Sequence, residues 1–286
     1  MPPGTGAGVI RNGLSPPFSA FGRARVVRHR IADPRWLLPD LTIAVLSDFH
    51  VCAPWVSLAT LRRLVGQVNR LGAGLILLPG DFIAERKLPG RVASAAEVIG
   101  VLSDLRAPLG VAAVLGNHDW RDCRLSRQSD FARNSVRDAL DASPIRHLAN
   151  AAACLRHGDG VFWLAGLDSQ QSRKHLGKHG FEDPEAAFAE VPAGAPVILM
   201  AHEPDYFGRG DPRAFLQVSG HTHGGQVNLL GWRPIVPSRY GARYAWGHVQ
   251  EGGRHLVVSG GIGYSGIPLR VLQPPEITLV TLQCGR

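Results

Sequence analysis

The sequence predicts an α/β fold in which two facing mixed β-sheets are flanked by helices. Two observations lead to this class. In the first half of the chain, strand-like segments alternate with helical segments of about 10 to 15 residues, which is the pattern of βαβ units and a largely parallel sheet. In the second half, short apolar strands predominate, and two stacked sheets bury many such strands.

The 286 residues show no break in composition, so we expect a single domain over residues 23–286. Residues 1–22 are rich in Gly, Pro and Ser and predict a disordered N-terminal arm. Directly after this arm, residues 25–31 alternate charged and apolar side chains, which is typical of a strand at the edge of a sheet.

The strands and helices of the first half follow from the periodicity of their apolar residues. Apolar runs predict strands at 41–47, 75–78 and 110–115, and apolar residues three and four positions apart predict helices at 57–71 and 91–105. The polar segment 121–142 is expected to be partly helical.

The second half consists mostly of short apolar runs bounded by Gly, Pro and polar residues. We expect strands at 145–148, 152–155, 161–167, 197–201, 215–219, 255–259 and 277–282. One helix is expected at 184–190, after a loop rich in Gly and Lys at 170–180.

The charge balance favours anionic partners. Lys and Arg outnumber Asp and Glu by 31 to 23, which gives a net charge of +8 and a pI near 9.9. The N-terminal region shows no secretory signal, and no stretch reaches the roughly 18 apolar residues of a membrane helix. We therefore expect no integral membrane segment and a cytoplasmic location. The basic N-terminal region leaves open a peripheral contact with an anionic membrane.

The four cysteines are widely separated and form no Cys-x-x-Cys pair. Neither a zinc knuckle nor a thioredoxin-like motif is therefore expected. Free thiols are the default for such cysteines, and they favour a reducing compartment.

Residues able to bind metals follow five of the predicted strands. In an open α/β sheet, ligands bind beyond the carboxyl ends of the strands. Because these ends meet at one rim, we expect the side chains that follow them to converge. The seven candidate metal ligands are Asp48, His50, Asp81, Asn117, His202, His221 and His223.

Two of the motifs are rare enough to be informative. A shuffled chain of this composition would contain about 0.002 copies of Gly-Asn-His-Asp and about 0.001 copies of Gly-His-Thr-His. Oxygen and imidazole ligands without thiolate suit manganese, iron or zinc. A dinuclear site also needs one ligand that bridges both ions, and Asp81 is the natural bridge.

Together the motifs resemble the calcineurin-like metallophosphoesterase superfamily over roughly residues 40–283. They are Asp-x-His at 48–50, Gly-Asp at 80–81, Gly-Asn-His-Asp at 116–119, the lone His202 and Gly-His-Thr-His at 220–223. The segments Gly-His-Thr-His-Gly-Gly-Gln-Val at 220–227, His-Glu-Pro-Asp at 202–205 and Gly-Ile-Pro-Leu-Arg at 266–270 resemble in particular the bacterial YaeI-like phosphodiesterase subgroup.

The resemblance implies two divalent metal ions and a catalytic histidine. One ion would be held by Asp48, His50, Asp81 and His223, and the other by Asp81, Asn117, His202 and His221. It also implies that His118 contacts the phosphate or the leaving group, with Asp119 orienting the ring.

The sequence leaves the roles of several residues outside these motifs open. Arg270 is a candidate for binding an anionic substrate, and the alternative is that it ties the C-terminal strand to the sheet. The aromatic residues either line an apolar substrate cleft or pack a loop onto the core, and they are Trp232, Tyr240, Tyr244 and Trp246.

We expect the protein to hydrolyse a phosphodiester or pyrophosphate bond through attack by a hydroxide held between the two metals. The preference for these bonds over a phosphomonoester follows from the subgroup resemblance alone. The expected substrate is a small phosphate compound, and the sequence leaves open whether it is linked to a lipid or to a nucleotide.

Two rival functions are less well supported by the residues. A non-catalytic, metal-containing binding module would be expected to have lost ligands, whereas all seven are present. A nuclease would need a clustered basic stripe interleaved with aromatic residues, so nucleic acid is not an expected partner.

Overall fold

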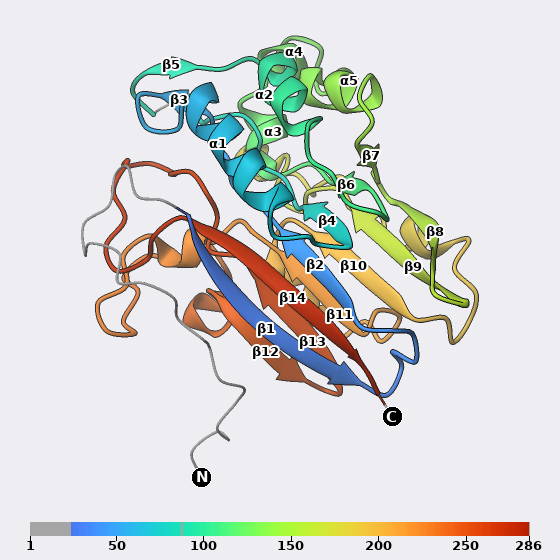
Figure 1. Ribbon diagram of the computed structural model, residues 1–286. Helices are drawn as coiled ribbons and strands as arrows, with labels where there is room; N and C mark the ends of the chain where they lie inside the picture. Colours follow the sequence, from blue (N-terminus) through green and yellow to red (C-terminus); the bar gives the residue numbers. More distant parts are fainter. Residues whose placement is uncertain (1–23, 87, 286) are drawn as a thin grey trace.

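The computed structural model describes residues 24–86 and 88–285, in which two six-stranded sheets face each other (Figure 1). Helices cover the outer side of the first sheet at the top of the molecule. The predicted class, two facing mixed sheets flanked by helices, is confirmed. The predicted N-terminal arm, residues 1–22, lies outside the described residues.

The first sheet has the strand order β1-β14-β2-β4-β6-β7. Its strands are β1 (Arg25–Asp33), β2 (Leu41–Val45), β4 (Leu75–Leu78), β6 (Val111–Ala113), β7 (Arg146–His147) and β14 (Glu276–Cys284). Strands β2, β4, β6 and β7 run parallel, whereas β14 lies antiparallel to β2 and parallel to β1. Strand β1 is at the edge of the sheet, as its alternating sequence predicted.

The second sheet has the order β12-β13-β11-β10-β9-β8. Its strands are β8 (Ala151–His157), β9 (Gly160–Leu167), β10 (Val197–Ala201), β11 (Leu216–Ser219), β12 (Gly247–Glu251) and β13 (Arg254–Val258). The four central strands are parallel, and the two edge strands are antiparallel to their neighbours. Strand β12 was not predicted. A further pair, β3 (Cys52–Ala53) and β5 (Arg91–Val92), forms a small separate ribbon.

The described α-helices begin at side-chain caps, except the one that begins after Gly116. They are α1 (Leu58–Asn69), α2 (Ala95–Leu102), α3 (Asn117–Arg121), α4 (Arg124–Gln128), α5 (Ser135–Asp141) and α6 (Pro184–Phe188), with short 3-10 turns at 174–176, 204–209, 223–225 and 241–244. The helix expected at 91–105 starts later, because a capping box between Ser94 and Glu97 defines its first turn and 91–92 pairs as β5. None of the described helices is long and apolar enough to cross a membrane.

Alternation of side chains along the strands creates the layers. In β2, Ile43 and Val45 belong to the core between the two sheets, whereas Ala44 belongs to the core under the helices. The inter-sheet core is closed at one end by Trp36, which is 0% exposed and packs edge-on against Phe162 with ring centroids 5.3 Å apart. A third layer forms where α6 packs on β8 and β9.

We expect Trp36→Ala to lower the free energy of unfolding by about 3 to 5 kcal/mol, because it would leave a cavity between the two sheets. The adjacent Leu37 provides a matched control, since its side chain is 70% exposed. Leu37→Ala should change the free energy by no more than about 0.5 kcal/mol. Urea unfolding of the two variants measures both values, and equal losses would contradict the assigned core.

Candidate metal centre

The seven predicted metal ligands converge at the carboxyl ends of strands from both sheets. Asp48 and His50 follow β2, Asp81 follows β4, Asn117 begins α3 after β6, His202 follows β10, and His221 and His223 follow β11. Each is at most 7% exposed. The convergence expected from the strand order is therefore present in the structure.

The candidate ligand atoms form two adjacent groups. Those of Asp48, His50 and His223 lie within 4.8 Å of one another, as do those of Asp81, His202 and His221. Between the groups, Asp81 Oδ2 lies 3.5 Å from His50 Nε2 and 3.1 Å from His202 Nε2. Asp81 thus occupies the position that a bridging ligand needs.

Several of these atoms are buried without a hydrogen-bond partner among the described residues: Asn117 Oδ1, His202 Nε2 and His221 Nε2. The His202 ring donates from Nδ1 to the carbonyl of Pro79 at 2.5 Å, so a neutral ring turns the lone pair of Nε2 toward Asp81. Two acceptors 3.1 Å apart repel each other unless a positive charge lies between them. The donor set therefore fits metal ions.

The electrostatics agree with this interpretation. Burial lowers the pKa of His221 and His223 well below the usual value and that of His50 to about 3, so these rings stay neutral, as metal binding requires. Burial also opposes protonation of His202, yet the charge of Asp81 outweighs it and raises the pKa of His202. The environment of His202 and Asp81 thus favours a positive charge, which a metal ion supplies.

The backbone at the site is held in an unfavourable conformation. Five of the seven ligands have a positive φ, and they are Asp48 at 55°, His50 at 41°, Asp81 at 57°, His221 at 70° and His223 at 52°. A side chain other than glycine rarely adopts this region, and each instance costs on the order of 1 kcal/mol or more. Such strain concentrated on one set of side chains indicates that their placement serves function.

Two glycines make room for the carboxylates. A Cβ atom at Gly116 would lie 2.2 Å from Asp81 Oδ1, and one at Gly220 would lie 2.5 Å from Asp48 Oδ2. Any larger residue at either position would displace one of these two carboxylates. This explains why Gly precedes Asn117 and His221 in the two rare motifs.

Asp119 has a different role from the one expected. Its carboxylate accepts four backbone N–H groups, from Asp81, Phe82, Ile83 and Gly116, at 2.8 to 3.1 Å. It thereby joins the segment that carries Asp81 to the segment that carries Asn117. The carboxylate does not orient the ring of His118, so this expectation requires correction.

Asp122 takes the orienting position instead. Its Oδ2 lies 2.7 Å from His118 Nδ1, and Arg121 Nη2 lies 2.9 Å from His118 Nε2. The His118 ring meets that of His50 edge-on, with centroids 4.9 Å apart, and its backbone N–H donates to Asp81 Oδ1 at 2.8 Å. The spacing of four residues on α3 was the available signal for Asp122, and the sequence analysis did not use it.

Arg270 is a structural residue. It is 1% exposed, and its guanidinium donates to the carbonyls of Gly260 at 2.8 Å and Gly263 at 2.6 Å, while Nη2 lies 3.2 Å from His223 Nδ1. Further bonds to the carbonyls of His223 and Gln273 occupy its remaining donors. The substrate-binding expectation for Arg270 is therefore corrected. The alternative, a tie between the C-terminal strand and the sheet, does not match the contacts either, because the hydrogen bonds of Arg270 join the loops around Gly263 and His223 and none reaches β14.

The aromatic residues after the last ligand separate into two groups. Tyr244 is 2% exposed and packs against Tyr240, and Trp246 donates to Glu276 Oε2 at 2.7 Å. These residues pack the loop onto the core, which was one of the two alternatives. Trp232 differs, since it is 64% exposed.

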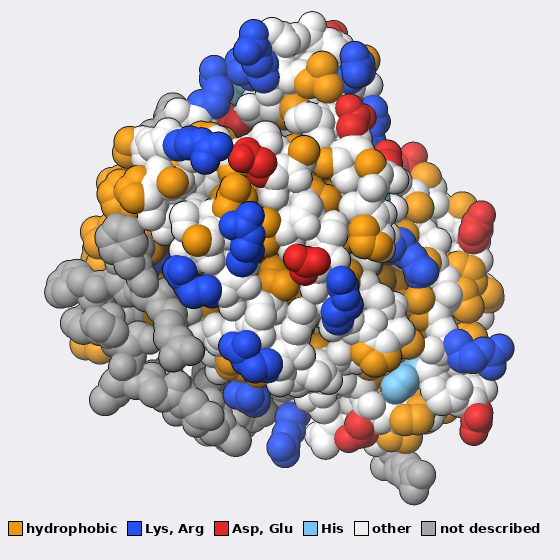
Figure 2. Space-filling model, turned by 45° about the horizontal axis from the view of Figure 1, so that its top comes forward, with side chains coloured by type: hydrophobic (Ala, Val, Ile, Leu, Met, Phe, Trp, Pro, Cys, Tyr) orange, Lys and Arg blue, Asp and Glu red, His pale blue; other side chains and the backbone are white. Residues whose placement is uncertain are grey.

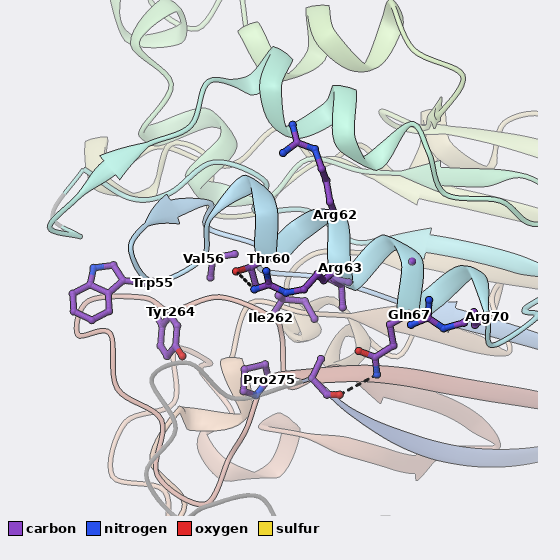
Figure 3. A pocket seen from close by; sticks show the side chains of 13 residues that line it. Trp55, Val56, Thr60, Arg62, Arg63, Gln67, Arg70, Ile262, Tyr264 and Pro275 are labelled. Atoms are coloured by element: carbon purple, nitrogen blue, oxygen red, sulfur yellow. Dashed lines mark hydrogen bonds between the residues drawn. The ribbon is translucent and has the colours of Figure 1, made fainter.

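A cavity of about 540 Å³ lies beside α1, and none of the seven metal ligands lines it (Figure 3). Its apolar wall includes Trp55 and Tyr264, and its polar wall includes Arg63 and Gln67 of α1. Tyr264 reaches it from the segment that follows Gly263, whose N–H donates to the carbonyl of Asp48 at 2.6 Å. The cavity and the metal centre thus share a supporting segment.

Comparisons with known proteins agree with the site. A model of the calcineurin-like phosphoesterase family matches residues 41–225, which contain all seven ligands. The chain is 31% identical to the "uncharacterized metallophosphoesterase YkuE" of Bacillus subtilis over 243 residues, covering 84% of this chain and 78% of that protein. It is 28% identical to the "phosphodiesterase YaeI" of Escherichia coli, covering 91% and 89%.

A vertebrate relative is longer than this chain. The "transmembrane protein with metallophosphoesterase domain" of Danio rerio is 30% identical over 253 residues, which cover 86% of this chain. The match spans only 54% of that protein.

We expect Asp119→Asn and Asp122→Asn to have different effects, because the two carboxylates support the site in different ways. Asn at 119 places an amide donor against backbone donors, so the variant should lose about 2 to 5 kcal/mol of unfolding free energy and bind metal more weakly. Asp122→Asn should keep both stability and metal content and lower only turnover. Denaturant unfolding and elemental analysis measure these effects. Full metal content and unchanged stability in Asp119→Asn would show that Asp119 is not needed to join the segments that carry Asp81 and Asn117.

Proposed function

The chain belongs to the calcineurin-like phosphoesterase family, and from this we propose that it hydrolyses a phosphodiester or pyrophosphate bond with two divalent metal ions at the described site. The observation that carries the proposal is the convergence of seven buried candidate ligands, among which Asn117 Oδ1, His202 Nε2 and His221 Nε2 have no hydrogen-bond partner among the described residues. A binding module without chemistry would not need this concentration of strained, uncompensated ligands.

The residues fit two ions better than one. Asp48, His50 and His223 form one group, Asp81 and two further histidines form the other, and Asp81 faces both. Manganese, iron and zinc are the candidates, because the ligands are oxygen and imidazole without thiolate. Two bound ions would supply Lewis acidity toward the phosphoryl group and a nucleophilic hydroxide near neutral pH.

His118 is the residue proposed to assist the departing oxygen. The carboxylate of Asp122 polarises its Nδ1, and its ring stands at right angles to that of His50 beside the metal ligands. Arg121 contacts the same ring from the partly exposed side, where its charge favours an anionic substrate. A proton held at His118 can be delivered to an alkoxide as it leaves.

The choice of bond rests on the relatives. The name of the Escherichia coli relative, a phosphodiesterase, supports a diester substrate, and the basic net charge of +8 suits a small phosphate compound. A phosphomonoester remains the alternative on the same site. A cytoplasmic location is also part of the proposal, supported by the four free cysteines.

We expect the purified protein to contain up to two manganese, iron or zinc ions and to lose phosphodiesterase activity when a strong chelator removes them. Adding the metal back should restore both metal content and turnover. Asp81→Asn should prevent this recovery, because a neutral amide supplies no charge to either ion. Elemental analysis and hydrolysis of bis-p-nitrophenyl phosphate are the measurements. Turnover by the metal-free protein would overturn the proposed function.

We expect His118→Asn to lower turnover by about 10² to 10⁴ while both metals stay bound. The loss should be smaller for a nitrophenyl ester than for an alkyl ester, because nitrophenolate departs without a proton. Equal losses on both esters would favour electrostatic stabilisation over proton donation.

Metal content of the same variant tests a second point. The ligand atoms of His50, Asp81 and His118 also lie within 4.8 Å of one another, so the geometry permits His118 to bind a metal. A His118→Asn protein that contains one ion fewer than the unmodified protein would show that His118 is a ligand.

A further inference from the structure

Two segments beside the metal centre carry exposed apolar side chains. One follows the last metal ligands and the other follows β13 and contains Arg270. The exposed residues are Leu229 (44%), Leu230 (98%), Trp232 (64%), Ile235 (75%), Ile267 (69%), Leu269 (40%) and Leu272 (42%), and we call this set the apolar rim. An accumulation of this kind on a protein surface indicates an interaction site.

The rim is held in place by hydrogen bonds between its two segments. Asn228 N–H donates to the carbonyl of Val271 at 2.9 Å, and Val271 N–H donates to the carbonyl of Gln226 at 2.9 Å. Leu229 and Trp232 bond to each other across a tight turn, which leaves Leu230 at the tip with a φ of 54°. A glycine would adopt this conformation without strain, so the exposed leucine does not contribute to folding.

The rim is also attached directly to the metal ligands. Arg233, the residue after Trp232, donates from Nε to the carbonyl of Gly224 at 2.9 Å, and Gly224 follows His223. In the other segment, Arg270 links Gly263 to His223. Whatever binds the rim is therefore held next to the metal centre.

Positive charge lies along α1, at the cavity beside this helix. Arg62 and Arg63 of α1 and its C-cap residue Arg70 are exposed, and no carboxylate within the described residues forms an ion pair with them. They line the same cavity as Tyr264, whose segment continues into the rim (Figure 3). Figure 2 shows apolar side chains gathered along the left edge of the molecule, with Lys and Arg side chains on the adjoining face.

We propose that the apolar rim and the neighbouring α1 arginines form a docking surface for an anionic lipid bilayer. Single apolar side chains that project from turns can enter the acyl region, a tryptophan suits the interface, and guanidinium groups suit anionic headgroups. A protein partner is favoured less, because the rim presents neither a helix groove nor a long free strand edge. The proposal concerns lipid binding alone and does not depend on the proposed reaction.

Sedimentation of the full chain with vesicles tests the docking surface. We expect binding to vesicles of phosphatidylcholine with phosphatidylglycerol and weaker binding to phosphatidylcholine alone. The double variant Leu230→Ser/Ile267→Ser, with one change in each segment, should bind the anionic vesicles at least about tenfold more weakly. The control is Leu37→Ser/Leu176→Ser, which removes two exposed leucines (70% and 46%) outside the rim and should bind normally.

A second pair of variants tests the charge. Gln at Arg62, Arg63 and Arg70 should reduce the preference for anionic vesicles, whereas Gln at the exposed Arg124, Arg127 and Arg133 should reduce it less. Equal effects of the two sets of substitutions would show that the α1 arginines are not part of the docking surface. The docking proposal is wrong if the unmodified chain stays unbound with anionic vesicles. A concentration-dependent dimer that disappears in Leu230→Ser/Ile267→Ser would assign the rim to a second copy of the chain instead.

Discussion

The arrangement of the candidate metal site depends on the repulsion among acceptor groups that are buried at one rim of the two sheets. Asp81 Oδ2 lies within 3.5 Å of His50 Nε2 and His202 Nε2, and Asn117 Oδ1 and His221 Nε2 are buried without hydrogen-bond partners among the described residues. These groups are buried, and a buried polar group without a partner is costly. Only positive charge among them makes the arrangement favourable, and for this reason the site is interpreted as a metal centre and not as a polar core.

The surrounding residues hold these groups in place against that repulsion. Asp119 binds two ligand segments through four backbone amides, and Arg270 binds the carbonyls behind His223. Both side chains are buried, and both form most of their hydrogen bonds with backbone groups. These hydrogen bonds hold Asp48 and Asp81 at a positive φ. Without such support, a residue at the end of a strand would adopt a more favourable backbone conformation.

The sequence predicts what depends on periodicity and on residue type. Residues 75–78 and 197–201 were placed as strands with the bounds that the structure gives, because each is an apolar run between turn residues. The seven candidate ligands could be expected to lie together because strand ends converge in any such sheet. The four-residue spacing of His118 and Asp122 was the one indication of which carboxylate faces the His118 ring, and the adjacent Asp119 was chosen instead. The sequence also did not show which aromatic side chains are exposed. Tyr244 is buried and Trp232 is exposed, although both belong to one Gly- and Pro-rich segment.

The candidate ligands lie at strand ends, whereas the surface around the site is formed by loops. The ligands come from strand ends whose positions follow from the two sheets, so they change little without loss of the fold. The segments 226–246 and 262–275 are mostly irregular, and substitutions on their exposed side leave the sheets intact. Yet Arg233 bonds to Gly224, and Arg270 bonds to the carbonyl of His223, so both segments are joined to the ligand loop itself. Variation on the exposed side of these segments can therefore alter the surroundings of the candidate metal site while the arrangement of its ligands stays the same.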